Sequence, residues 1–173
     1  MTLGALVERY AQYEKRGVVF YRGLAERFAS TPVAARIWRE LSNTEASHFA
    51  LLELCEDWIA MAKESASAPP VTPEALNALE ARMAELEARA QETSCSLEEG
   101  LGLTVTWEEL ELPRILELVD HLPGQARGRI MAGMIAEAAE HYRLLAELVR
   151  SAGAPVEAGR VEALAAQARA ALG

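Results

Sequence analysis

Apolar residues recur along most of the chain at the spacing of an α-helix rather than that of a strand. Between Ile37 and Ile59, successive residues placed about 100° apart bring the apolar positions onto one stripe. The members of that stripe are Trp38, Leu41, Glu45, His48, Phe49, Leu52 and Ile59. No segment alternates with a period of two for long enough to predict a strand. The pattern therefore predicts an all-α protein.

Turn residues and helix-capping residues divide this helical pattern into segments. Pro32 fits the first turn of a helix, and the segment that begins with Ser96 has the form of a capping box. Residues 65–71 (SASAPPV) form the clearest linker. We predict a first helical hairpin over 2–64, a crossover over 65–94 with a mostly exposed helix, a second hairpin over 95–151, and a short C-terminal helix over 155–172. The length of 173 residues suits a single domain, 1–173.

Composition and charge exclude several classes of partner and location. The net charge is -9, and acidic and basic residues are mixed along the helices, which argues against nucleic acid or an anionic membrane surface as a partner. No run of ~20 apolar residues predicts a membrane span, and the charged N-terminal segment does not resemble a signal peptide. Cys55 and Cys95 lack CxxC spacing, so we expect two free thiols and a cytoplasmic protein.

Two residues in the stripe of the second predicted helix, Glu45 and His48, are unexpected in an apolar core. An ionised carboxylate buried without a partner is costly, so a cation is expected beside Glu45. A Glu and a His three residues apart project from one helix face, which is a spacing suited to metal binding. For a single inward Glu, the alternative interpretation is a local irregularity or a buried salt bridge, and for His48 it is a hydrogen-bonded core histidine.

The two halves of the chain repeat this arrangement. Glu14 lies in the first apolar stripe, 34 residues before His48, and Glu108 lies in the third, 33 residues before His141. Glu111 follows Glu108 by one turn in the same stripe. Carboxylates gathered in this way would repel one another without cations or bound protons. Because di-iron four-helix bundles use one Glu from each of two helices and Glu-x-x-His from the other two, the pattern predicts a metal centre.

The fourth predicted helix departs from a symmetric metal centre. Ala138 occupies the position three residues before His141, where a second Glu-x-x-His would need a carboxylate. Glu137 lies at the edge of the stripe and would reach the centre if the helix bulged locally. Glu111 is another source of the missing charge, and Pro113 is expected to kink its helix nearby. A site with one metal ion, or with none, is the alternative.

At these residues the chain resembles the rubrerythrin branch of the ferritin-like di-iron superfamily, over roughly residues 5 to 150. The similarity lies in the motifs Glu14-x-x-Gly17-x-x-Phe20-Tyr21, Leu41-x-x-x-Glu45-x-x-His48, and Ser96-Leu97-Glu98-Glu99 leading to Glu108-x-x-Glu111. The resemblance implies a ferritin-like antiparallel four-helix bundle with a long crossover. It further implies that two iron ions, or manganese in their place, bind to Glu14, Glu45, His48, Glu108, Glu111 and His141.

The resemblance also implies a function, a non-haem di-iron oxidoreductase that reduces hydrogen peroxide or dioxygen or oxidises Fe(II). The sequence lacks the CxxC-bearing rubredoxin-type domain of full-length rubrerythrins, so a separate electron-donor protein is expected. We expect a homodimer, because the first helix and the crossover expose an apolar stripe. Two alternatives stay open: a ferritin-like bundle with a degenerate metal site that acts as a binding or structural module, and an iron-storing subunit.

Overall fold

The computed structural model describes residues 1–61 and 68–172, and the secondary structure within these ranges is entirely helical. The helices are α1 (Leu3–Arg27), α2 (Pro32–Met61), α3 (Pro73–Gln91), α4 (Leu97–His121), α5 (Gly124–Ala152) and α6 (Pro155–Leu172). The prediction of an all-α protein is confirmed. The predicted end of the second helix at residue 64 lies outside the described residues, as does the first part of the linker.

Local capping interactions set the ends of several helices. Thr2, Thr72 and Ser96 each accept a hydrogen bond of 3.2 Å from the backbone N–H three residues later, at the starts of α1, α3 and α4. Gly153 follows α5 in the left-handed conformation, with φ of 68°, which a glycine adopts without steric cost. The α4 helix continues past Pro113, and a kink there stays a prediction.

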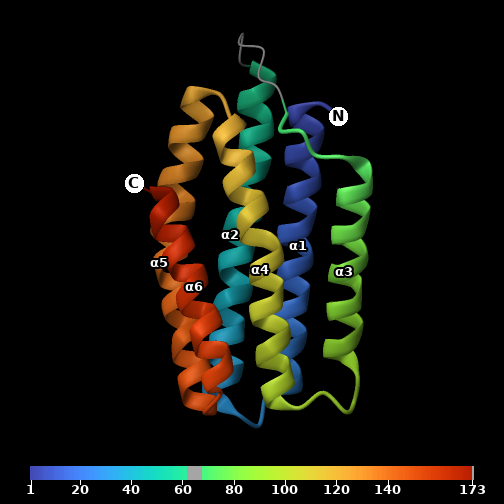
Figure 1. Cartoon of the computed structure of the whole chain (residues 1–173), viewed down its shortest axis with the longest axis vertical. Coiled ribbons are helices and arrows are strands. Elements are labelled where there is room, and N and C mark those ends of the chain that lie inside the picture. The colour runs from blue at the N-terminus through green and yellow to red at the C-terminus, as the bar shows by residue number, and fades with distance from the viewer. Residues whose placement is uncertain (62–67, 173) are drawn as a thin grey trace.

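Four of the helices surround a common interior. All six lie roughly along the long axis of the molecule, and each runs opposite to the one before it in the chain (Figure 1). The α1 helix packs against α2 and α4, and α5 packs against the same two helices. The α3 helix covers α1 and α4 from outside, and α6 covers α4 and α5. Because α3 carries the chain back along the molecule, α2 and α4 run in the same direction.

Large apolar side chains fill the interior on either side of the polar residues described below. Trp38 is fully buried, and its indole Nε1 donates a hydrogen bond of 2.9 Å to Thr104 Oγ1, which joins α2 to α4. The crossover helix α3 is mostly exposed, and one of its faces is buried. Its buried face is formed by Leu76, Leu79, Met83, Leu86 and Ala90.

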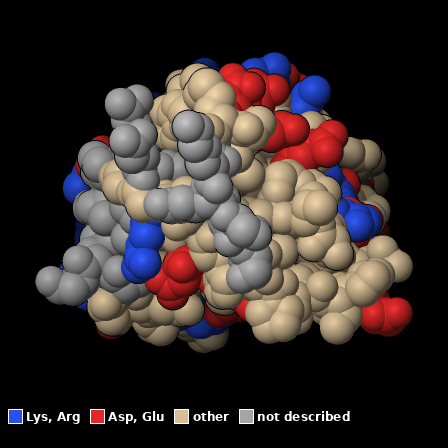
Figure 2. Space-filling model, turned by 90° about the horizontal axis from the view of Figure 1, so that it is seen from above, with Lys and Arg blue, Asp and Glu red and all other residues tan. Residues whose placement is uncertain are grey.

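Acidic and basic residues are interspersed on the surface and form ion pairs with one another. Arg9 and Arg16 of α1 bind Glu80 and Glu87 of α3, each at 2.8 Å, and so tie the crossover helix to α1. On the end of the molecule seen in Figure 2, acidic and basic side chains lie close together, with uncharged residues over much of the rest. None of the described helices combines the length and apolarity that crossing a membrane requires.

Candidate metal centre

Four helices bring acidic and imidazole side chains to one interior position. The α1 helix contributes Glu14, α2 contributes Glu45 and His48, α4 contributes two glutamates, and α5 contributes one histidine. All of them are buried. The residues predicted from the apolar stripes are thus gathered in space, namely Glu14, Glu45, His48, Glu108, Glu111 and His141.

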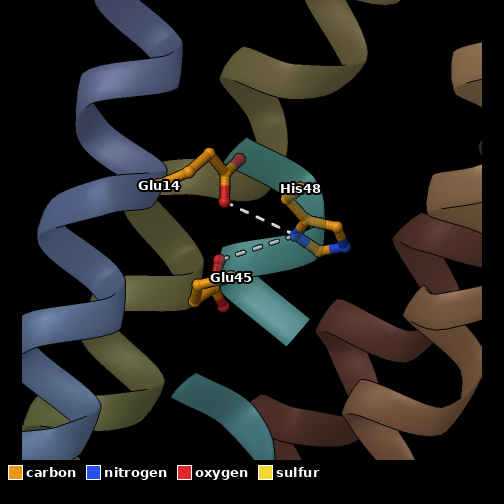
Figure 3. A group of neighbouring side chains, drawn as sticks. All are labelled: Glu14, Glu45 and His48. Atoms are coloured by element: carbon orange, nitrogen blue, oxygen red, sulfur yellow. Dashed lines mark ion pairs between the residues drawn. The ribbon is translucent and has the colours of Figure 1, made fainter. Parts of the chain in front are cut away.

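The first group of side chains joins α1 to α2. Glu14 and Glu45 both point toward the imidazole of His48 (Figure 3). His48 Nδ1 lies 3.4 Å from Glu14 Oε2 and 3.5 Å from Glu45 Oε2. The three candidate ligand atoms lie within 4.8 Å of one another, so a single metal ion could contact all of them.

The second group shares Glu45 with the first. His141 Nε2 lies 2.7 Å from Glu108 Oε1, and His141 Nδ1 lies 3.7 Å from Glu45 Oε1. Candidate ligand atoms of Glu45, Glu108 and His141 also lie within 4.8 Å of one another. One oxygen of Glu45 therefore faces His48 and the other faces His141. The two imidazole rings are nearly parallel, with centroids 6.3 Å apart.

Buried polar atoms without hydrogen-bond partners are concentrated at this position. They include both carboxylate oxygens of Glu14 and of Glu45, together with Glu111 Oε1, His48 Nε2 and His141 Nδ1. An unsatisfied buried polar group costs about 1–3 kcal/mol, and more if it is charged. The described ion pairs of Glu14, Glu45 and Glu108 involve histidines, with no Arg or Lys among them. Carboxylate oxygen and imidazole nitrogen are common metal ligands, so this donor set fits a metal ion.

Burial makes three of the carboxyl groups hold their protons more tightly than usual. Burial raises the pKa of Glu14 to about 7. At Glu45, burial and then the nearby charge of Glu14 raise the pKa to about 8. Burial and the same neighbouring carboxylates raise the pKa of Glu111 well above its ordinary value. Without a cation, the centre is therefore partly protonated near neutral pH.

The histidines and Glu108 are shifted in the opposite sense, toward their charged forms. Burial alone would raise the pKa of Glu108, but the charge and hydrogen bond of His141 lower it overall. Burial alone would lower the pKa of a histidine, yet Glu45 raises that of His48 and Glu108 raises that of His141. The 2.7 Å contact between His141 and Glu108 thus has the character of an ion pair.

The structure places the two remaining predicted ligands differently from the others. Glu111 is buried and lines the same cavity, but it belongs to neither three-residue group. Glu137 is partly exposed, and its Oε2 lies 3.6 Å from His48 Nε2. The α5 helix is continuous, so Glu137 approaches His48 without the local bulge that was the predicted condition for its reaching the centre. The side chain of Ala138 lies outside the described part of the structure.

Two aromatic residues bind carboxylates of the centre through hydrogen bonds that sequence reasoning did not identify. Trp107 Nε1 donates a hydrogen bond of 3.1 Å to Glu111 Oε2, and the Tyr21 hydroxyl donates one of 2.5 Å to Glu108 Oε1. The spacing of four residues between Trp107 and Glu111 on one helix is a signal that could have identified the first contact. These donors orient the two carboxylates of α4.

Close packing at Gly17 leads to a prediction about metal affinity. A Cβ atom at Gly17 would lie 3.1 Å from Glu45 Cγ, closer than ordinary van der Waals contact. We expect Gly17→Ala to displace the Glu45 carboxylate and to weaken metal binding by about tenfold, because ligands must be held closely in position. Isothermal titration with Mn(II) measures the change.

The matched control for Gly17→Ala is Gly23→Ala in the same helix. A Cβ atom at Gly23 would meet nothing within 4 Å. Both variants gain helix propensity, up to about 1 kcal/mol. Unchanged affinity in both variants would show that the position of Glu45 does not limit binding.

Comparison with known proteins finds no match to this chain among protein-family models, curated proteins or solved structures. The chemistry of the centre itself is therefore what indicates a function. Two overlapping groups of buried ligand atoms, Glu14–Glu45–His48 and Glu45–Glu108–His141, could each hold a metal ion.

Proposed function

We propose that this chain is a ferritin-like dimetal oxidoreductase of rubrerythrin type, which reduces hydrogen peroxide or dioxygen or oxidises Fe(II). The observation that carries the proposal is the position of Glu45, whose two oxygens face the two histidines. A carboxylate in that position would bridge two ions, each with one further Glu and one His. This agrees with the ligand set of dimetal four-helix bundles, except for the missing carboxylate at Ala138.

The arrangement of helices supports the ferritin-like part of the proposal. In this interpretation α1 and α2 form the first antiparallel pair of the bundle, and α4 and α5 form the second. The α3 helix belongs to the long crossover that lets α2 and α4 run in the same direction. The ligands come from the four bundle helices and from neither covering helix.

The proposed ligands are divided between two metal ions. Glu14 and His48 would hold one ion, Glu108 and His141 the other, and Glu45 both. Glu111 lines the centre, and the Glu137 side chain near His48 is a further candidate ligand. Two bound iron or manganese ions would supply the one-electron redox chemistry that protein side chains lack.

The protein's own residues prepare the environment for that chemistry. The centre is buried, which excludes bulk water and strengthens its electrostatic interactions. The Tyr21 hydroxyl keeps its proton on the bond to Glu108, because burial and the Glu108 charge raise the pKa of Tyr21 well above its ordinary value.

A separate electron-donor protein, a cytoplasmic location and a homodimer belong to the same proposal. Cys55 and Cys95 are free thiols, both buried, which suits a reducing compartment. The exposed side chain of Val19 on α1 lies in a surface hollow between α1 and α3, where a second copy would cover apolar area.

Metal content tests the proposed function directly. Protein from iron-supplemented cells, or reconstituted anaerobically with Fe(II) or Mn(II), is expected to hold about two ions per chain. Crystals of this protein should show two anomalous peaks, one on each side of Glu45, and the iron and manganese edges identify the metal. A content below ~0.2 ions per chain would overturn the proposal and favour a degenerate site in a binding or structural module.

A further inference from the structure

The metal centre opens into a cavity that continues beyond the ligands. The cavity has a volume of about 70 Å³, and one end is formed by the buried glutamates and histidines. We call the other end the apolar arm. It is lined by Leu112, Ile115, Leu116, Val119, Met134 and Ala168.

The apolar arm follows α4 away from the ligands. The residues of α4 that line the cavity run from Glu108 to Val119, a rise of roughly 16 Å along a helix. Met134 of α5 and Ala168 of α6 close the arm from the other sides. Because a small volume is spread over this length, the cavity is narrow.

The chemistry of the lining selects what can occupy the arm. Apart from the ligands, the residues around the cavity are apolar except for Tyr142. Hydrogen peroxide has two hydroxyl groups that would lose their hydrogen bonds to water along such a wall. Dioxygen makes no strong hydrogen bonds with water and suffers no such loss.

We propose that the apolar arm binds a small apolar molecule of about the size of dioxygen and leads it to the metal centre. The inference rests on the proposed function and selects dioxygen, rather than hydrogen peroxide, as the oxidant. The size of the cavity agrees with this choice. An apolar cavity of about 150 Å³ stays dry and takes up benzene or xenon, and the present cavity is smaller.

Xenon binding to the metal-free protein tests the proposal independently of redox activity. Crystals pressurised with xenon should show an anomalous peak in the apolar arm, between α4 and α6. Ala168→Leu adds three carbon atoms to the wall of the arm and is expected to lower xenon occupancy by about fivefold or more. Ala165→Leu is the matched control, because Ala165 lies one turn earlier in α6 and does not line the cavity. If Ala168→Leu does not fold, Val119→Leu fills the far part of the arm.

Oxidation of the reduced, metal-loaded protein tests which molecule uses the arm. Ala168→Leu should slow oxidation by dissolved dioxygen by about tenfold, with oxidation by hydrogen peroxide unchanged. Wild-type crystals without xenon in the arm, or equal slowing of both oxidants, would overturn the proposal. Xenon in the arm of a protein that binds no metal would instead overturn the proposed function and leave the cavity's preference for apolar molecules intact.

Discussion

Replacing Glu45 with glutamine is expected to abolish binding of both metal ions. Glu45 is the residue that the two ligand groups share, with Oε2 3.5 Å from His48 and Oε1 3.7 Å from His141. Metal ligands of this kind bind as carboxylates, and a neutral amide cannot replace a bridging negative charge. We expect the metal content to fall from about two ions to below ~0.2 per chain, as measured by inductively coupled plasma mass spectrometry.

The matched control is Glu140→Gln, which removes the same charge from the surface of α5. Glu140 is exposed and bonded to Arg143, and it takes no part in either group. Its replacement should leave metal content unchanged. If Glu45→Gln also kept two ions, Glu45 would not be the shared ligand.

The same Glu45→Gln variant should be more stable than the wild type when metal is absent. Burial and the nearby Glu14 charge raise the pKa of Glu45 to about 8, so at pH 9 the wild type carries a buried carboxylate without a cation. The amide avoids that charge, and we expect the free energy of unfolding to rise by about 1–3 kcal/mol. Chemical denaturation at pH 9 measures it.

The metal-free wild type is expected to lose stability as the pH rises from 5 to 9. Glu14 and Glu45 have folded pKa values of about 7 and about 8, above the ordinary value of 4.5 that they have in the unfolded chain. The folded state therefore holds more protons across this range, and its stability falls as they are released. His48 and His141 act in the same direction, because their raised pKa values stabilise the fold at low pH and that contribution is lost as the pH rises.

The size of this effect follows from linkage. A pKa unit corresponds to about 1.4 kcal/mol, so several groups together change the free energy of unfolding by several kcal/mol. For a chain of this length, that lowers the melting temperature by roughly 10 °C, measurable by calorimetry. Glu108 opposes the trend only below its ordinary pKa, because its own pKa is lowered. A melting temperature that rises between pH 5 and pH 9 would contradict the prediction.

Metal loading should remove this pH dependence. Metal ions displace protons from their ligands, so binding is expected to release protons and to strengthen as the pH rises from 6 to 8. A pH-indicator dye in weak buffer measures the release. Binding without proton release would mean that the ligands are already ionised in the metal-free protein.

The sequence located most of the candidate centre because its acidic residues interrupt the apolar pattern around them. Glu14, Glu45 and Glu108 occupy positions where an apolar stripe demands apolar side chains, and all three are buried. The helix ends could also be predicted from the sequence, because capping residues such as Ser96 bind backbone groups close by in the chain. Both kinds of feature depend on residues close together in the chain.

Features that depend on tertiary contacts could not be derived in this way. Helical angle places Glu137 only at the edge of its stripe, and its approach to His48 depends on how α5 packs against α2. The hydrogen bond from Tyr21 to Glu108 likewise joins residues far apart in the chain. The apolar face of α3 follows from its helical spacing, but the choice of α1 and α4 as the helices that it covers is a tertiary contact that no local pattern records.

The shared position of Glu45 also has a consequence for how the centre would fill. If both ions bind as proposed, the first fixes the carboxylate that the second requires and neutralises part of the surrounding negative charge. Occupation of the two positions would then be cooperative. At limiting metal supply, chains with two ions and chains with none would outnumber those with one, so the population would divide into active and inactive molecules.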